Sequence, residues 1–278
     1  MLRTHALQAL ACAAIEEKLQ MVERTPLDES IDVNAQLSAP GPLPGREEKP
    51  LLVPPSQLEK RSMNTPTGRT IMLHAIAHIE FNAINLALDI VWRFAGLPEK
   101  FYRDWFRIAK EEVLHFRLIH EHLQTLGFQY GDFPAHHGLW EMADKTQDDI
   151  LARLALVPRT LEARGLDVNR PIYNKLVQAG DHVAGKILDV ILRDEIGHVA
   201  AGNNWYHYIC QARGLEPIHT YAQLATQYNA PKMRGPFTLD ARREAGFTEA
   251  ELTELDMLGQ SPYFRKYSIL TKLSKKDY

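Results

Sequence analysis

Two copies of one short motif place a carboxylate and an imidazole at helical spacing. Glu112 and His115 occur in KEEVLHF, and Glu195 and His198 occur in RDEIGHV. Residues three apart in an α-helix lie on the same face, so each pair can reach a single metal ion. One Glu-x-x-His arises readily by chance in a charged helix. Two copies on separate long helical stretches, each within an apolar stripe, indicate a metal site.

Two further glutamates lie on apolar helical stripes and would complete such a site. Glu80 is flanked by Ile76 and Ala83, and Glu162 occurs in LVPRTLEARGL. A carboxylate buried on an apolar face is unfavourable unless something compensates its charge, and a cation does so directly. Taken singly, either acid fits a solvated helix face. Pro158 interrupts the helical hydrogen bonds before Glu162, so a kink there directs that side chain either inward or elsewhere.

The candidate ligands are one glutamate from each of two helices and one Glu-x-x-His from each of two others. They are Glu80, Glu112, His115, Glu162, Glu195 and His198. Four carboxylates balance two divalent cations, and oxygen and nitrogen donors without thiolate suit iron or manganese better than structural zinc. This is the ligand arrangement of ferritin-like di-iron and di-manganese bundles. We therefore expect two Fe ions, with an Mn/Fe pair or two Mn ions as alternatives.

An acid directly precedes the ligand glutamate in both motifs. These acids are Glu111 and Asp194. A metal-bound histidine usually donates its other N–H to a carboxylate, a carbonyl or water. The two acids are therefore candidates for orienting His115 and His198 across the bundle, and the alternative is that they are surface acids.

Histidines outside the two motifs are expected to be packed or exposed rather than ligands. His74 and His78 are four residues apart, but His78 lies about 200° around the helix from Glu80 and should not share its face. The same expectation holds for His122 and for the remaining histidines.

Four long helices are expected to position the ligands, separated by glycine- and proline-containing breaks. Their ranges are 66–93, 98–127, 143–164 and 171–214. Thr65 is a suitable N-cap for the first helix, with proline in the first helical position. The expected fold class is all-α: a ferritin-like four-helix bundle with an N-terminal helix, a Pro-rich arm and short C-terminal helices.

The chain is expected to fall into four segments. They are an N-terminal helix (1–23), a Pro-rich arm (24–65), the bundle (66–214) and a C-terminal helical extension packed on it (215–278). Seven of the sixteen prolines lie between residues 24 and 56, which excludes a long helix there. Short helices are expected at 219–227 and 248–258, the second with a capping box formed by Thr248 and Glu251.

The bulk composition limits the class of protein. The 278 residues are 45% hydrophobic and carry a net charge of −3, which permits a substantial core and does not suggest a nucleic-acid-binding protein. Two cysteines, Cys12 and Cys210, do not make a disulfide framework, which favours a reducing cytoplasm. No apolar stretch approaches the roughly 18 residues needed to cross a bilayer, so we expect a cytoplasmic protein without membrane contact.

The order Glu, Glu-x-x-His, Glu, Glu-x-x-His resembles the ferritin-like di-iron carboxylate superfamily, and more narrowly the ferritin-like DUF455 family. The stretches that carry the resemblance span most of residues 66–247. They are HAIAHIEFNAINLALD (74–89), AKEEVLHFRLI (109–119), LALVPRTLEARGLDV (154–168), RDEIGHVAAGNNWY (193–206) and APKMRGPFTLDARREAGF (230–247). The resemblance implies iron-dependent oxygen chemistry, but the superfamily also contains storage proteins and peroxidases, so the fold alone does not choose a function.

Three functions remain open. The leading one is a di-iron or Mn/Fe oxidase or oxygenase that activates O2 to oxidise or hydroxylate a small organic substrate, with an unidentified electron donor. The second is a tRNA-hydroxylase-like enzyme, for which Lys232, Arg234, Arg242 and Arg243 would supply a basic surface. The third is non-catalytic iron storage or buffering, or an interaction bundle. The long arm and extension argue against a storage cage, and a homodimer is left open.

Overall fold

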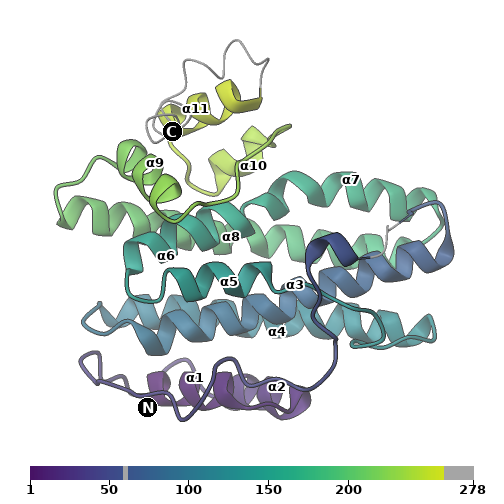
Figure 1. Cartoon of the computed structure of the whole chain (residues 1–278), viewed down its shortest axis with the longest axis horizontal. Coiled ribbons are helices and arrows are strands. Elements are labelled where there is room, and N and C mark those ends of the chain that lie inside the picture. The colour runs from purple at the N-terminus through teal and green to yellow at the C-terminus, as the bar shows by residue number, and fades with distance from the viewer. Residues whose placement is uncertain (59–61, 260–278) are drawn as a thin grey trace. The chain divides into compact units, whose positions relative to one another are not determined.

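The structure is a computed structural model that describes residues 1–58 and 62–259 (Figure 1). Over these residues the regular secondary structure is helical, apart from an isolated parallel β-bridge between Leu52 and Ala135. The all-α fold class predicted from the sequence is therefore confirmed.

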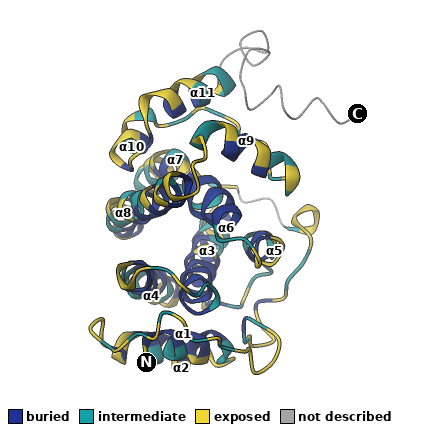
Figure 2. Ribbon diagram, turned by 90° about the vertical axis from the view of Figure 1, so that its left-hand side faces the viewer, coloured by how far each residue is buried: buried dark blue, intermediate teal, exposed yellow. Residues whose placement is uncertain are grey.

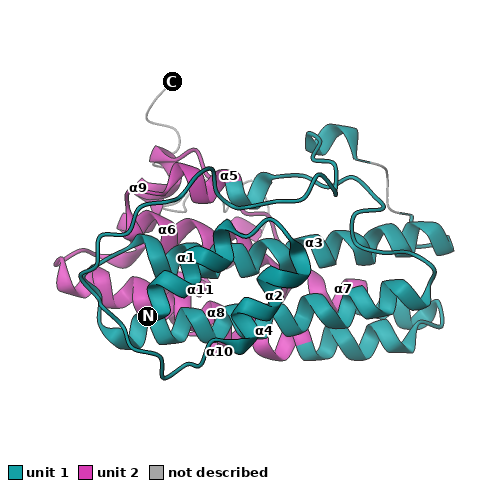
Figure 3. Cartoon of the chain, turned by 90° about the horizontal axis from the view of Figure 1, so that it is seen from below, with its two compact units in different colours: residues 1–140, 173–190 teal, residues 141–172, 191–278 magenta. Residues whose placement is uncertain are grey.

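The chain divides into two compact units (Figure 3). The first contains Met1–Trp140 and Tyr173–Val190, and the second contains Glu141–Ile172 and Ile191–Tyr278. The division into four sequence segments stays a prediction.

Two long helices, α3 (Pro66–Arg93) and α4 (Glu99–Thr125), pack against each other in the first unit. As predicted, α3 begins with a proline, and the Thr65 hydroxyl caps it by accepting a hydrogen bond from Gly68 N at 3.1 Å. Both helices agree closely with the ranges expected from the sequence, which places the first Glu and the first Glu-x-x-His on neighbouring helices.

Helix α3 is apolar and buried along most of its length (Figure 2). Among the described residues it is the one helix that is long and apolar enough to span a membrane, by length and composition only, with a mean hydropathy of 1.4 over 18 residues. This corrects the expectation that no apolar stretch approaches that length. Because 78% of that window is buried inside the protein, α3 behaves as the core helix of a soluble protein does. The cytoplasmic location stays a prediction.

Two short helices, α1 (Leu2–Ala11) and α2 (Ile15–Arg24), pack on this pair. They replace the single helix expected over residues 1–23. Arg3 is only 2% exposed and anchors α1, because its guanidinium donates to two carbonyls at the C-terminal end of α3 at 2.8 and 3.2 Å. The last carbonyls of a helix have no partner within the helix, so this contact satisfies them.

The Pro-rich arm runs along the first unit. Between α2 and the 3-10 turn η1 (Pro55–Gln57) it contains no helix, as its prolines predict. Gly45 N donates to Leu10 O at 2.9 Å, and the bridge at Leu52 fixes a later part. A Cβ at Gly45 would overlap Ala11 O, so this close approach of the arm to α1 requires glycine.

The later helices, apart from α8, are shorter than α3 and α4. They are α5 (Gly138–Lys145), α6 (Ile150–Leu156), the π-helical turn η2 (Val157–Glu162), α7 (Arg164–Gln178), α8 (His182–Ala212), α9 (Pro217–Gln227), α10 (Leu239–Glu244) and α11 (Glu249–Gly259). Buried residues from α7, α8 and α11, including Leu166, Val199 and Leu252, form a core within the second unit.

Helices α9 and α11 confirm the two C-terminal helices that the sequence predicts, whereas α10 was not expected. The capping box of α11 is also confirmed. Thr248 N donates to Glu251 Oε2 at 2.8 Å, and Glu251 N donates to Thr248 Oγ1 at 3.3 Å.

The helix expected over 143–164 is wrong, and the helix expected over 171–214 begins later than predicted, as α8 at His182. The first range is split into α5, α6 and η2, and the π-helical turn begins next to Pro158. Pro171 lies inside α7 instead of starting a helix. The break between α7 and α8 falls instead at Gly180, whose φ of 89° is readily adopted by glycine.

Candidate metal centre

Three of the predicted ligands lie together within the first unit. Glu80 is on α3, while Glu112 and His115 are on α4. His115 Nδ1 lies 3.3 Å from Glu112 Oε2 and 3.4 Å from Glu80 Oε2. The three residues are 4%, 1% and 0% exposed, respectively. The motif spacing and the packing of α3 on α4 therefore bring two acids and an imidazole to one buried point.

The electrostatics of this point favour a positive charge. Burial opposes the charged form of His115, but hydrogen bonds and the negative charges of Glu112 and Glu80 outweigh it and raise the pKa of His115 to about 11. Two buried carboxylates require such compensation, since an uncompensated buried charge is strongly unfavourable. A proton on His115 supplies it, and so would a metal cation bound by the same three side chains.

These three residues could hold a metal ion. One ligand atom can be taken from each of Glu80, Glu112 and His115 so that the three atoms lie within 4.8 Å of one another. Carboxylate oxygen and imidazole nitrogen bind several divalent metals, including iron, manganese and zinc. The donor set therefore fits a metal ion, while the identity of the metal stays a prediction.

The second Glu-x-x-His lies on one face of α8, within the second unit. His198 Nδ1 is 3.8 Å from Glu195 Oε1, and the side chains are 1% and 12% exposed. The apolar stripe predicted for this helix is also present: Ala184, Ile187, Leu188 and Ile191 are buried. The local geometry predicted from the sequence is thus confirmed for this motif.

Glu162 is the last residue of the π-helical turn η2 and is half-buried. The sequence prediction that Pro158 disturbs the helix here is confirmed, because Ala163 N bonds to Pro158 O at 3.0 Å, five residues back instead of four. Such π-turns occur frequently at functional sites. The full set of six ligands, including Glu162 and His198, stays a prediction.

The acids that precede the two motifs each have an arginine partner. Glu111 Oε1 accepts a hydrogen bond from Arg107 at 2.6 Å, and Asp194 Oδ1 accepts one from Arg193 at 2.8 Å. Both acids also take part in other interactions. Their proposed role in orienting the histidines stays a prediction.

Three histidines outside the motifs, His74, His78 and His122, make hydrogen bonds or ion pairs within the first unit. His74 Nε2 accepts from Gly131 N at 2.9 Å. His78 bonds to the Tyr130 hydroxyl at 2.8 Å, and burial, as the largest cause, lowers the pKa of His78 to about 4. His122 Nε2 lies 3.0 Å from Asp181 Oδ2.

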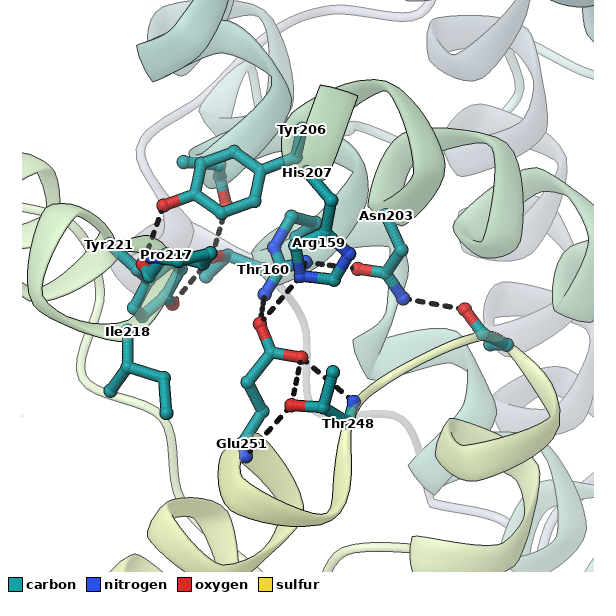
Figure 4. Close-up of polar contacts among 12 residues, drawn as sticks. Arg159, Thr160, Asn203, Tyr206, His207, Pro217, Ile218, Tyr221, Thr248 and Glu251 are labelled. Carbon is teal, nitrogen blue, oxygen red and sulfur yellow. Dashed lines mark hydrogen bonds and ion pairs between the residues drawn. The ribbon is translucent and has the colours of Figure 1, made fainter. Parts of the chain in front are cut away.

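Sequence reasoning missed a buried network around Arg159, which is on the same turn as Glu162 (Figure 4). Arg159 is 3% exposed and donates to Asn203 Oδ1 on α8 at 2.6 Å and to Glu251 Oε1 on α11 at 2.5 Å. His207 Nε2 also contacts Glu251 Oε1, at 3.1 Å. The network therefore holds the π-helical turn onto two other helices of the second unit.

The electrostatics of Glu251 reflect this network. Burial raises its pKa, but hydrogen bonds from His207 and Thr248 and the charge of Arg159 outweigh that effect and hold the pKa at about 2. No motif marks this pairing, because the partners lie 92 residues apart in the chain. Pro158, in the middle of the expected helix, was the one local signal in the sequence that the chain is irregular here.

Fold and site together define an all-helical protein with a buried carboxylate–histidine group that could hold a metal ion. The chain belongs to the family described as "Protein of unknown function (DUF455)", whose family model matches residues 4–253. An "Uncharacterized protein" of Haemophilus influenzae is 53% identical over 212 residues, which cover 74% of each chain. No solved structure matches the chain significantly.

Proposed function

We propose that this protein is a ferritin-like di-metal carboxylate enzyme of the oxidase or oxygenase type, using O2 to oxidise or hydroxylate a small organic substrate. The observation that carries the proposal is the buried triad formed by Glu80, Glu112 and His115. His115 Nδ1 lies 3.3 Å from Glu112 Oε2 and 3.4 Å from Glu80 Oε2, and all three side chains are almost inaccessible to water. Buried ionisable groups with strongly shifted pKa values cluster at functional sites.

In this proposal the triad and the second-unit residues Glu162, Glu195 and His198 hold two iron ions, or alternatively Mn/Fe or two Mn. The bound metals would supply the oxygen and redox chemistry, which protein side chains alone do not provide. The protein itself balances the charge of the metals, orients the ligands and keeps water away from the site. Four carboxylates offset the charge of two divalent ions, and the apolar stripes around the motifs exclude bulk water.

The tRNA-hydroxylase-like alternative has lost part of its support. It relied on a basic surface after the bundle, but Arg242 is 1% exposed and pairs with Asp167 at 2.6 Å. Arg243 is paired with Glu249 at 2.6 Å. Lys232, Arg234 and the paired Arg243 are exposed, and so few cations attract a nucleic acid only weakly.

Oxygen consumption tests the proposal. Protein freed of metal, then loaded anaerobically with Fe²⁺ and exposed to O2, should consume O2 faster than free Fe²⁺ and develop a new optical absorption. Glu112→Ala should abolish both signals, since it removes a ligand buried at the centre of the site. Glu121→Ala is the matched control, because Glu121 is an exposed acid on the same helix. Equal rates for wild type, Glu112→Ala and free Fe²⁺ would refute the proposal.

A further inference from the structure

A pocket lies in the first unit, between the Pro-rich arm and helix α3. It contains about 360 Å³ of empty space, including the part open to solvent. His78, Asn82 and Asn85 line it from α3, and their spacing of four and three residues places them on one helix face. Glu80 lies about 200° around the helix from His78, so this pocket faces away from the metal ligands.

The floor of the pocket is built from buried polar side chains. Asn82 is 5% exposed, Asn85 is 2% exposed and Tyr130 is 9% exposed. Asn82 Nδ2 donates to His78 O at 2.7 Å, and Asn85 Nδ2 donates to Phe81 O at 3.1 Å. These bonds fix both amides in place, which is the rigidity expected of a binding site rather than of a mobile surface.

A lysine without an acidic partner lies directly behind this floor. Lys18 is 0% exposed, and its ammonium donates to Asn85 Oδ1 at 2.8 Å and to Gly45 O at 3.0 Å. Among the described residues no carboxylate lies within ion-pair distance of it. Lysine is almost never fully buried unless it is paired. Burial above all, and also the nearby charge of Arg46, lowers the pKa of Lys18 to about 7.

The mouth of the pocket adds further positive charge. Arg46 and Lys49 line it from the arm and are both exposed. Glu47 is the one acid among the described lining residues, and its Oε1 accepts a hydrogen bond from Ile15 N at 2.9 Å. Two exposed cations and one acid therefore line the pocket, with Lys18 behind its floor, so its field favours an anion.

We propose that this pocket binds a small anion, a carboxylate or a phosphate group, between Arg46 and Lys49 at the mouth and the amide floor over Lys18. The anion would meet the two exposed cations directly, since charged donors make the strongest hydrogen bonds to such oxygens. It would also supply the negative charge that Lys18 lacks. This inference is independent of the metal chemistry proposed above.

Isothermal titration calorimetry with inorganic phosphate and with acetate, at constant ionic strength, tests this site. Wild type should bind one of these anions, or both, at a single saturable site. The double variant Arg46→Gln/Lys49→Gln should weaken binding at least ~10-fold, because charge-assisted contacts are lost. Arg24→Gln/Lys100→Gln removes the same charge from exposed positions outside the pocket and should leave the affinity within about twofold.

Comparing the two anions distinguishes a phosphate-binding site from a carboxylate-binding site. Binding of phosphate alone identifies a phosphate site, and binding of acetate alone identifies a carboxylate site. Absence of saturable binding for both anions would overturn the proposal. So would binding that Arg46→Gln/Lys49→Gln leaves unchanged, which would locate the anion elsewhere, or an equal loss in both double variants, which would show only an effect of net charge.

Discussion

His115 Nδ1 lies 3.4 Å from Glu80 Oε2, so two buried polar side chains join α4 to α3 in the middle of an apolar helix pair. With Glu112, they introduce ionisable groups where apolar residues would pack at lower cost. Helix α4 carries two such buried groups, Glu112 and His115, three positions apart. A proton on His115 or a bound metal ion would offset the negative charge of the two glutamates, and we propose that the metal ion does so.

The packing of η2 on α8 should depend on Gly202. A Cβ at this position would lie 2.7 Å from Pro158 Cβ, a separation that side chains do not tolerate. Gly202→Ala should therefore lower the free energy of unfolding by about 1–3 kcal/mol, as overpacking does. Gly197 is the matched control on the same helix, since nothing lies within 4 Å of a Cβ there.

Gly197→Ala should raise the free energy of unfolding by about 0.5–1 kcal/mol, because alanine favours a helix over glycine. Urea denaturation followed by circular dichroism measures both changes. Equal effects of the two substitutions would contradict the close contact between η2 and α8.

The Arg159–Glu251 pair should stabilise the second unit in a pH-dependent way. Glu251→Gln leaves a buried guanidinium without its carboxylate, and should cost about 3–5 kcal/mol of unfolding free energy at pH 7. The pKa of Glu251 is about 2 in the folded state, below its ordinary value of 4.5. The stabilisation is therefore complete above pH 4.5 and is lost as the pH falls towards 2.

Denaturation of wild type and Glu251→Gln at pH 7, 4 and 3 measures the difference between their free energies of unfolding. This difference should be smaller at pH 4 and pH 3 than at pH 7. Glu249→Gln removes an exposed acid from the same helix and is the control. A difference that stays constant from pH 7 to 3 would show that the ionised carboxylate is not the stabilising group.

Buried Lys18 should make stability rise with pH. Its pKa is about 7 in the folded protein against an ordinary 10.5, so the unfolded chain binds more protons between these values. Wild type should gain stability relative to Lys18→Met by at most about 1.4 kcal/mol per pH unit from pH 7 upwards. Urea denaturation at pH 7 and 9.5 tests this, and a difference that does not change with pH would refute the low pKa.

Local signals in the sequence were sufficient to predict much of the fold. They were also sufficient to predict three of the six expected ligands that the structure brings together, namely Glu80, Glu112 and His115. Thr65 and the proline after it mark the start of α3, and Thr248 with Glu251 marks the start of α11. The Glu112–His115 spacing gives a shared face whatever the tertiary structure. These features depend on neighbours within one helical turn, which is why they could be predicted.

The remaining features depend on contacts or on competing local preferences. The sequence pattern predicts a helix start at Pro171, yet α7 continues through it and ends before Gly180. The better signal was Asp181, whose Oδ1 caps α8 by accepting from Ala184 N at 2.9 Å. The Arg159–Glu251 pair joins residues far apart in the chain, and no periodicity encodes such a pair.

Metal stoichiometry tests the central claim most directly. Protein purified from iron-replete cells and freed of loosely bound ions should retain two metal ions per chain by elemental analysis, and Glu121→Ala should retain the same number. Glu80→Ala and Glu112→Ala should each retain fewer, because each removes a buried carboxylate that contacts His115. Wild type that retains no metal, or a Glu112→Ala variant that retains two ions, would contradict the account.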